Sequence, residues 1–173
     1  MKVVLHICCG VCAAGVVEKL LSEGHEVCGY FFNPNIHPQE EYMRRLETAV
    51  KVAEEMKFTL EEGAYVPEDW CKETESLAGE PEGGRRCEVC YKYRLEGTYR
   101  YMKDSGLDVF TTTLTVSPHK SAEVINRIGV EIGSEHFLAR DFKKKAGFQR
   151  ANELAKEWHL HRQDYCGCVF SKR

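Results

Sequence analysis

Seven of the nine cysteines in this chain fall into three tight groups, which are Cys8-Cys9-x-x-Cys12, Cys87-x-x-Cys90 and Cys166-x-Cys168. Thiolates at such spacings can reach one metal ion or one face of an iron–sulfur cluster. Seven thiols exceed what one tetrahedral zinc needs. The simplest partition is four plus three, a [4Fe–4S] cluster and a second metal with an open coordination position. An open position is typical of a catalytic metal rather than a structural one.

Other interpretations of these cysteines stay open. A structural zinc or free thiols would account for Cys87 and Cys90, and Cys8 and Cys9 could be small buried residues at the end of a strand. Zinc and iron–sulfur centres both use thiolates, so the residues alone do not separate them. Adjacent side chains on an extended backbone point in different directions, so Cys8 and Cys9 could serve different metals. The remaining cysteines, Cys28 and Cys71, are expected in the core.

The composition limits the class of protein. The 173 residues favour one domain, and 24 basic against 27 acidic residues give a net charge of −3. That balance excludes a globally basic nucleic-acid binder but leaves room for a local basic patch. No stretch is apolar for long enough to span a membrane, and the first ten residues are too short for a signal peptide. We therefore expect a cytoplasmic protein, in which clustered cysteines bind metal or do redox chemistry.

Strand and helix patterns alternate along the chain. Strands are expected at 2–7, 26–33, 58–64, 108–116 and 135–142, and helices at 13–24, 38–56, 88–106, 119–133 and 147–159. This alternation predicts an α/β fold with one parallel sheet and helices on both faces. An irregular cysteine-bearing segment (about 65–90) and a cysteine-bearing tail (160–173) complete a single domain over residues 1–173. Ligands of such sheets bind at the carboxyl ends of the strands, where Cys8, Asn33 and Ser117 are predicted to lie.

Further polar residues near these strand ends are candidates for substrate binding. Asn33 and Asn35 lie between prolines in FNPNIHP, although Asn and Pro are also ordinary turn residues. Ser117 precedes a predicted helix (119–133) whose free amides could bind an anion, and it could equally be a simple helix cap. Lys120, in the first turn of this helix, would suit a phosphate, or it could be a solvated helix lysine. His6, inside the first strand, is expected to be a core histidine.

The tail motif QDYCGC places Asp164 and Tyr165 beside two thiols, where either could donate a proton. Basic residues cluster at Arg44-Arg45, at Arg85-Arg86 and at 143–145 with Arg150. Each cluster alone is typical of a solvated face. Together, around a metal cleft, they could hold an RNA backbone, with unstacked bases placed on aromatic side chains. The aromatic candidates are Tyr91, Tyr93 and Phe148.

Five motifs in order resemble those of the metal-dependent epoxyqueuosine reductase family of the QueH type. They are CCGVC after the first strand, FNPNIHP after the second, RRCEVCYKYRL, TTLTVSPHK and the terminal QDYCGC. The resemblance extends from residue 3 to residue 170. One departure is Val11, where the family pattern usually has proline, and it affects the turn more than any ligand.

The resemblance implies a fold like that of adenine-nucleotide hydrolases (HUP-like), and the reduction of epoxyqueuosine to queuosine in tRNA without cobalamin. It implies a [4Fe–4S] cluster and a neighbouring mononuclear metal, iron. The implied metal-binding residues are Cys8, Cys9, Cys12, Cys87, Cys90, Cys166 and Cys168. The implied partners are a tRNA carrying epoxyqueuosine in its anticodon loop and an external electron donor of the ferredoxin or flavodoxin type, and no membrane.

Two rival functions belong to other classes. An ATP-using tRNA-modifying enzyme of the same fold group would need a phosphate-binding loop after the first strand, where CCGVCAAG stands instead. A redox sensor built on zinc or an iron–sulfur centre that contacts RNA or protein would account for the cysteines. The polar residues gathered at strand ends favour an enzyme, because a sensor needs no substrate cleft.

Overall fold

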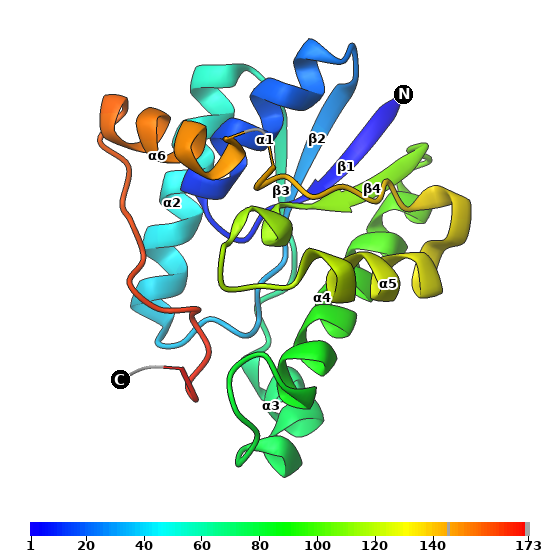
Figure 1. The fold of residues 1–173 in the computed structure, drawn as a ribbon, viewed down its shortest axis with the longest axis vertical. Coiled ribbons are helices and arrows are strands. Elements are labelled where there is room, and N and C mark those ends of the chain that lie inside the picture. Colours follow the sequence, from blue (N-terminus) through cyan, green and yellow to red (C-terminus); the bar gives the residue numbers. More distant parts are fainter. Residues whose placement is uncertain (145, 172–173) are drawn as a thin grey trace.

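Four parallel strands form the sheet in the computed structural model, which describes residues 1–144 and 146–171 (Figure 1). Their order across the sheet is β3-β2-β1-β4. The strands are β1 (Lys2–His6), β2 (Glu26–Phe31), β3 (Thr59–Glu62) and β4 (Val109–Thr112). In the central strand β1, His6 pairs with Tyr30 of β2 and with Thr112 of β4. All four strands therefore bring their carboxyl ends to the same edge of the sheet.

Helices cover both faces of this sheet. They are α1 (Gly10–Ser22), α2 (Gln39–Met56), α3 (Pro67–Thr74), α4 (Arg85–Asp104), α5 (Ala122–Gly133) and α6 (Gly147–Glu157). Helices α1, α2 and α6 pack on one face, and α4 and α5 pack on the other. The predicted parallel α/β fold with helices on both faces is confirmed. Within the described part of the chain, no helix combines the length and apolar character needed to cross a membrane.

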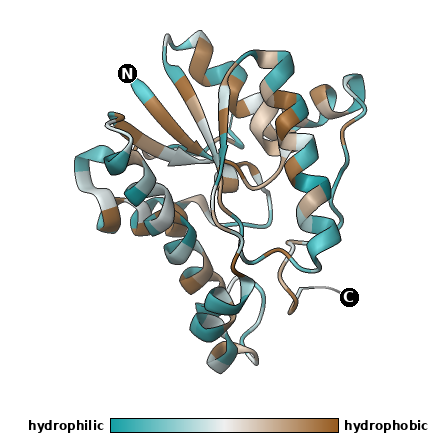
Figure 2. Ribbon diagram, turned by 180° about the vertical axis from the view of Figure 1, so that it is seen from behind, coloured by the Kyte–Doolittle hydropathy of each residue, from teal (hydrophilic) through white to brown (hydrophobic). Residues whose placement is uncertain are grey.

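The apolar run of β1 explains why it lies at the centre. Val3, Leu5 and Ile7 point into the core beneath α1 and α2, whereas Val4 points into the core beneath α4 and α5. A strand that is covered on both faces needs apolar side chains in both directions, which is why it reads as a continuous hydrophobic run. Figure 2 shows the middle of this strand in the hydrophobic colour. The core histidine predicted at His6 is confirmed, because its side chain is fully buried.

The fifth predicted strand, 135–142, is wrong. Phe137 makes one isolated parallel bridge with Phe110, and the Leu138 amide donates to the Phe110 carbonyl at 2.9 Å. The Leu138 carbonyl accepts a hydrogen bond from the Thr111 hydroxyl at 2.8 Å instead of from a backbone amide. A side-chain donor therefore ends the pairing before a ladder can form.

Several element boundaries also differ from the prediction. The strand expected over 108–116 ends at Thr112 and continues as a 3-10 turn over Thr113–Val116. The irregular segment holds the short helix α3. Helices α1 and α4 each begin three residues earlier than expected, at Gly10 and Arg85. Because of these earlier starts, Cys12 and Cys87 lie in the first turns of helices rather than in loops.

Candidate metal centre

The three thiols of the first motif meet at the carboxyl end of β1. Their sulfurs all lie within 4.8 Å of one another, and those of Cys8 and Cys9 are 3.9 Å apart. Cys9 occupies the N-cap position of α1, so the chain turns from strand into helix between the first thiol and the third. Gly10 permits this turn, because a Cβ there would lie 2.5 Å from the Thr48 side chain of α2. We call this group the Cys8–Cys9–Cys12 triad.

The triad corrects the expectation that Cys8 and Cys9 point apart. Their sulfurs converge, although the backbone at Cys9 is extended (φ −168°, ψ 160°). Three sulfurs bound to one tetrahedral zinc at about 2.3 Å lie about 3.8 Å from each other. The spacing of the triad is therefore close to that of three ligands of a single metal ion, with one tetrahedral position left open.

The three thiols of the triad differ in their pKa values. Hydrogen bonds with Cys12 and Cys9 hold the pKa of the Cys8 thiol well below its ordinary value, assisted by the Arg94 charge and the Thr113 hydroxyl. The pKa of Cys9 is raised to about 12, because its contact with Cys12, which lowers it, is outweighed by Cys8 and by burial. The pKa of Cys12 is raised by hydrogen bonds with Cys8 and Cys9 and by burial. Binding of a metal would thus displace protons mainly from Cys9 and Cys12.

Two side chains from distant segments donate hydrogen bonds to the triad. The Thr113 hydroxyl, just after β4, lies 3.3 Å from the Cys8 sulfur and also accepts the Cys8 amide at 3.1 Å. The Gln163 amide nitrogen, in the tail, lies 3.0 Å from the Cys9 sulfur. Donors at this position stabilise thiolates and orient metal ligands. Neither residue was singled out from the sequence, since a threonine and a glutamine carry no spacing signal.

The other four clustered cysteines gather where α4 begins. Cys90 and Cys168 pack with the buried Trp70 in one apolar cluster. Burial raises the pKa of Cys87, and it raises that of Cys90 to about 11. Charges on Cys166 and Cys168 push both values further in the same direction. The tail therefore brings its CGC motif to the first turns of α4. We call Cys87, Cys90, Cys166 and Cys168 the four-cysteine group.

A buried ion pair on α2 holds the tail in place. The Arg45 side chain donates to Glu41 at 2.7 Å, to the Cys166 carbonyl at 2.9 Å and to the Tyr165 carbonyl at 3.0 Å. Gly167 has a φ of +114°, which only glycine adopts readily, and its carbonyl accepts the His37 amide at 2.7 Å. The glycine of CGC is therefore required by the backbone conformation between the two thiols. Figure 1 shows the tail running beside α2.

A cavity of about 790 Å³ opens between the two cysteine groups. Cys8 and Cys12 of the triad and Cys166 of the four-cysteine group line it, together with Arg94. Its volume lies in the range of small-molecule sites, which is about 300–1,000 Å³. The predicted residues Ser117, Lys120, Asp164 and Tyr165 also line this cavity.

The two predicted proton donors differ in their contacts. The Tyr165 hydroxyl donates a hydrogen bond to the His37 carbonyl, and the Arg45 guanidinium lies 5.3 Å from the centre of its ring. Asp164 is exposed at the cavity. Tyr165 therefore has its proton engaged in the fold, whereas the Asp164 carboxyl faces the open space.

The two residues expected to bind an anion both line the cavity. The Ser117 hydroxyl accepts the His119 amide at 3.3 Å, and Ser121 rather than Ser117 caps α5. Burial lowers the pKa of Lys120, but the charges of Cys166 and Cys8 raise it by more, so the ammonium stays charged. A cation is thus held beside the thiols of both groups.

Asn33 and Asn35 lie outside the lining of the cavity and are fully buried. The Asn33 amide donates to the Ile7 carbonyl at 2.8 Å and accepts from Arg94 at 2.7 Å. The Asn35 side chain has no hydrogen-bond partner among the described residues. Asn33 therefore supports the end of β1 next to Cys8.

Most residues of the predicted basic clusters are engaged in hydrogen bonds or ion pairs within the protein. Arg86 is buried and donates to the carbonyls of Leu77, Ala78 and Glu80, and Arg85 is exposed at the start of α4, outside the cavity. Arg150 pairs with Glu18 at 2.7 Å. Arg45 holds the tail, as described above. Lys143 and Lys144 both pair with Asp141, and Lys145 lies outside the described residues.

The aromatic residues named for base stacking also separate. Tyr91 is buried, and Tyr93 packs against the Trp70 cluster. Phe148, at the start of α6, is 42 % exposed and lines the cavity. Only Phe148 of the three therefore presents a free ring at this cavity.

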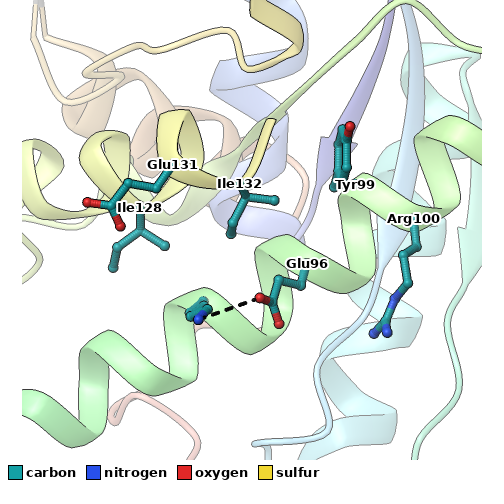
Figure 3. Close-up of a pocket in the computed structure, with 7 residues that line it drawn as sticks. Glu96, Tyr99, Arg100, Ile128, Glu131 and Ile132 are labelled. Atoms are coloured by element: carbon teal, nitrogen blue, oxygen red, sulfur yellow. Dashed lines mark ion pairs between the residues drawn. The ribbon is translucent and has the colours of Figure 1, made fainter. Parts of the chain in front are cut away.

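A second hollow, of about 540 Å³, lies between α4 and α5 and contains none of the predicted residues. Figure 3 shows Ile128 and Ile132 of α5 pointing toward α4, which carries Glu96, Tyr99 and Arg100. Its dashed line is the ion pair between Lys92 and Glu96, whose charged atoms lie 3.8 Å apart. No thiol lines it. The predicted site residues that line a cavity therefore all line the larger one.

The fold and the site define an α/β protein whose sheet edge carries partly buried thiols able to hold a metal beside a cavity of substrate size. The family model described as "Epoxyqueuosine reductase QueH" matches residues 3–173. Proteins named epoxyqueuosine reductase QueH from Streptococcus pyogenes serotype M1, Acinetobacter baylyi and Thermotoga maritima are 36 %, 35 % and 34 % identical to the chain. These alignments cover 99 %, 99 % and 98 % of this chain, and 71 %, 81 % and 89 % of the respective relatives.

The chain therefore belongs to the epoxyqueuosine reductase QueH family, and the predicted family is confirmed. A reductase is an oxidoreductase, so the expectation of an enzyme of this class is also confirmed. The assignment favours the reductase over the ATP-using enzyme and the redox sensor.

Proposed function

We propose that this protein reduces epoxyqueuosine to queuosine in tRNA. The observation that carries the proposal is the Cys8–Cys9–Cys12 triad, whose sulfurs lie within 4.8 Å of one another beside a cavity of about 790 Å³. The epoxyqueuosine reductase names of the relatives supply the substrate class. The cytoplasm, where tRNA is modified, is the compartment that we assign to the reaction.

The seven clustered thiols fit two metal centres. In our proposal the triad holds a single metal, iron, because its sulfur spacing suits one tetrahedral ion. The four-cysteine group holds a [4Fe–4S] cluster, because four thiolates are what such a cluster takes. Burial of Cys90 and Cys168 against Trp70 limits the access of water to this group.

The reaction removes one oxygen atom from the substrate. Both carbon–oxygen bonds of the epoxide break and a carbon–carbon double bond forms, while two electrons and two protons are taken up and water is released. When bound, the metal centres would supply the electrons one at a time and a Lewis acid for the oxygen. The electrons come from an external donor of the ferredoxin or flavodoxin type.

The chain's own residues would handle charge and protons around that oxygen. Lys120 remains charged beside Cys8 and Cys166, so it can stabilise negative charge that develops on the oxygen. Asp164 faces the cavity and is the better candidate for delivering a proton, because the Tyr165 hydroxyl already donates to His37. Tyr165 in this proposal orients the tail instead.

Recognition of tRNA would use the rim of the same cavity. The exposed ring of Phe148 can stack on an unpaired base, which is the usual mode for single-stranded RNA. Arg162 lines the cavity, and Arg85 is exposed near the four-cysteine group, so both are placed for phosphate contacts. Asn33, Asn35 and Arg86 would act on the substrate only through the segments that they hold.

The test is conversion of tRNA that carries epoxyqueuosine by protein reconstituted without oxygen, with a chemical reductant in place of the natural donor. Nucleosides from the digested tRNA are separated and weighed by mass spectrometry. We expect queuosine from the wild type and from Cys28→Ser, whose thiol lies outside both groups, and none from Cys12→Ser. Conversion by Cys12→Ser at the wild-type rate, or none by metal-loaded wild type, would refute the proposal.

A further inference from the structure

We infer that Arg94 is the counter-charge shared by the two cysteine groups, and that it positions them and makes the metal centres that they hold easier to reduce. Arg94 lies four positions after Cys90 and seven after Cys87, so all three side chains lie on one face of α4. The inference rests on the proposed function in one respect, namely that the two groups hold metal.

The Arg94 side chain is buried and reaches the cavity. The residue is 2 % exposed, and it lines the same cavity as Cys8, Cys12 and Cys166. Its Nη2 atom donates to Asn33 at 2.7 Å, and Asn33 donates in turn to the carbonyl of Ile7, the residue before Cys8. One arginine thus links the helix of Cys87 and Cys90 to the strand end of the triad.

No carboxylate neutralises this buried cation. Among the described residues, every ion pair within 4.0 Å involves other basic side chains. The Arg94 Nε atom is buried and has no hydrogen-bond acceptor in the described structure. A buried charge without a partner is costly, so proteins provide one.

Thiolates are the negative groups that surround Arg94. Arg94 lines one cavity with Cys8 and Cys166 and follows Cys90 by one helical turn, so thiols of both cysteine groups lie around it. The cation is therefore compensated only when thiolates are present, which is the state that a bound metal stabilises.

Two effects on a bound metal follow from this arrangement. A fixed positive charge favours the more negative, reduced state of a thiolate-bound centre, so it raises the reduction potential. A supporting residue of this kind also orders the ligands, and its loss commonly lowers metal affinity by about 10- to 100-fold. A role confined to packing would produce the second effect without the first.

The experiment compares Arg94→Met, Arg94→Lys, Asn33→Ala and the control Arg100→Met. Arg100 lies on the same helix, is exposed and lines the separate hollow between α4 and α5. Two quantities are measured without oxygen: the affinity of the metal-free chain for Co²⁺ against a competing chelator, and the reduction potential of the reconstituted protein by spectroscopic titration.

We expect Arg94→Met to bind Co²⁺ about 10- to 100-fold more weakly than wild type and to shift the potential to more negative values. Arg94→Lys, which keeps the charge, should recover most of the potential. Asn33→Ala should weaken binding while leaving the potential near that of wild type, and Arg100→Met should change neither. An unchanged potential in Arg94→Met, or equal shifts in the Met and Lys variants, would overturn the inference.

The failure of the inference can be told apart from failure of the proposed function. If the wild type takes up no redox-active metal, the proposed reductase chemistry fails. The affinity for Co²⁺ alone then tests the role of Arg94. In that case equal Co²⁺ affinity of wild type and Arg94→Met contradicts the inference, and a 10-fold or greater loss that Arg94→Lys restores supports it.

Discussion

Gln163 donates a hydrogen bond of 3.0 Å to the sulfur of Cys9, across 154 positions of the chain. This contact joins the tail, which carries the CGC motif, to the thiols at the end of the first strand. It makes the triad dependent on the last part of the sequence, although all three of its thiols come from residues 8–12.

Replacing Gln163 by leucine tests that dependence. The variant keeps the approximate volume of the side chain but removes the donor, so the Cys9 thiolate loses its partner. We expect metal affinity to fall by about 10-fold, which is the low end for a supporting residue. Competition with a chelator measures it, and Gln149→Leu, an exposed residue on α6, is the matched control. Equal affinities of the two variants would show that the contact is incidental.

Removing Arg45 should release the tail. Arg45→Met leaves the buried Glu41 carboxylate with only Arg44 and His161 nearby, at 3.6 and 3.4 Å, and leaves the carbonyls of the tail without donors. We expect a loss of about 3 kcal/mol in the free energy of unfolding, the low end for breaking a buried pair. Urea denaturation measures this loss, and limited proteolysis should show earlier cleavage after residue 160.

The control for this prediction is Arg44→Met, because Arg44 is on the same helix and exposed. It should cost less than about 1 kcal/mol, as exposed ion pairs do. A tail that stays protected from protease in Arg45→Met would contradict the anchoring role.

His6 should make the stability of the chain depend on pH. Its pKa is lowered to about 3, chiefly by burial and then by Arg94, while its ring nitrogens contact Thr112 and the Phe32 carbonyl. Below about pH 6.5 the unfolded chain takes up a proton that the folded chain does not. The free energy of unfolding therefore falls as the pH drops from about 6.5 toward 3, approaching about 1.4 kcal/mol per pH unit for this group.

Denaturation of metal-free protein between pH 7 and pH 5 measures that slope. His6→Asn, which cannot be protonated, should show a shallower dependence than wild type, even if it is less stable overall. His159→Asn, at an exposed histidine, should keep the wild-type slope. The same slope in wild type and His6→Asn would rule out His6 as the source.

Gly10→Ala tests the turn that brings the triad together. The added Cβ would lie 2.5 Å from the Thr48 side chain and 2.6 Å from its carbonyl oxygen, so α1 or α2 must move. We expect a loss of about 1–3 kcal/mol in the free energy of unfolding. Gly15→Ala, on the same helix, meets Ala151 at an ordinary 3.4 Å and should be neutral or stabilising. Equal stabilities of the two variants in urea would contradict the close approach.

The fold could be predicted from the sequence where one local pattern decides the structure. The apolar run of the first strand and the helical spacing of residues 38–56 lead directly to β1 and α2. Segment 135–142 has a strand-like composition, but its pairing with β4 depends on which donor binds the Leu138 carbonyl. That choice involves Thr111, far along the chain, and no local pattern records it.

The candidate site divides in the same way. The spacing of the clustered cysteines indicates a metal site, and the sulfurs of Cys8, Cys9 and Cys12 do lie close together. The direction of the Cys9 thiol was missed, because it depends on the turn into α1 rather than on an ideal strand.

The residues that support the thiols were also missed. Arg94 looks like a solvated helix arginine, yet it is buried between the cysteine groups. The signal that could have found it is its position on the helical face of Cys87 and Cys90. The sequence does not distinguish Arg45 from its neighbour Arg44, although Arg45 is buried and Arg44 is exposed.

The most direct test of the account is the iron and acid-labile sulfide content of protein purified without oxygen, measured in wild type, Cys12→Ser and Cys168→Ser. We predict about five irons and about four sulfides per chain in wild type. Cys12→Ser should lose about one iron and keep its sulfide, whereas Cys168→Ser should lose most of both. One zinc with no sulfide in the wild type would remove the source of electrons and contradict the proposed reductase chemistry.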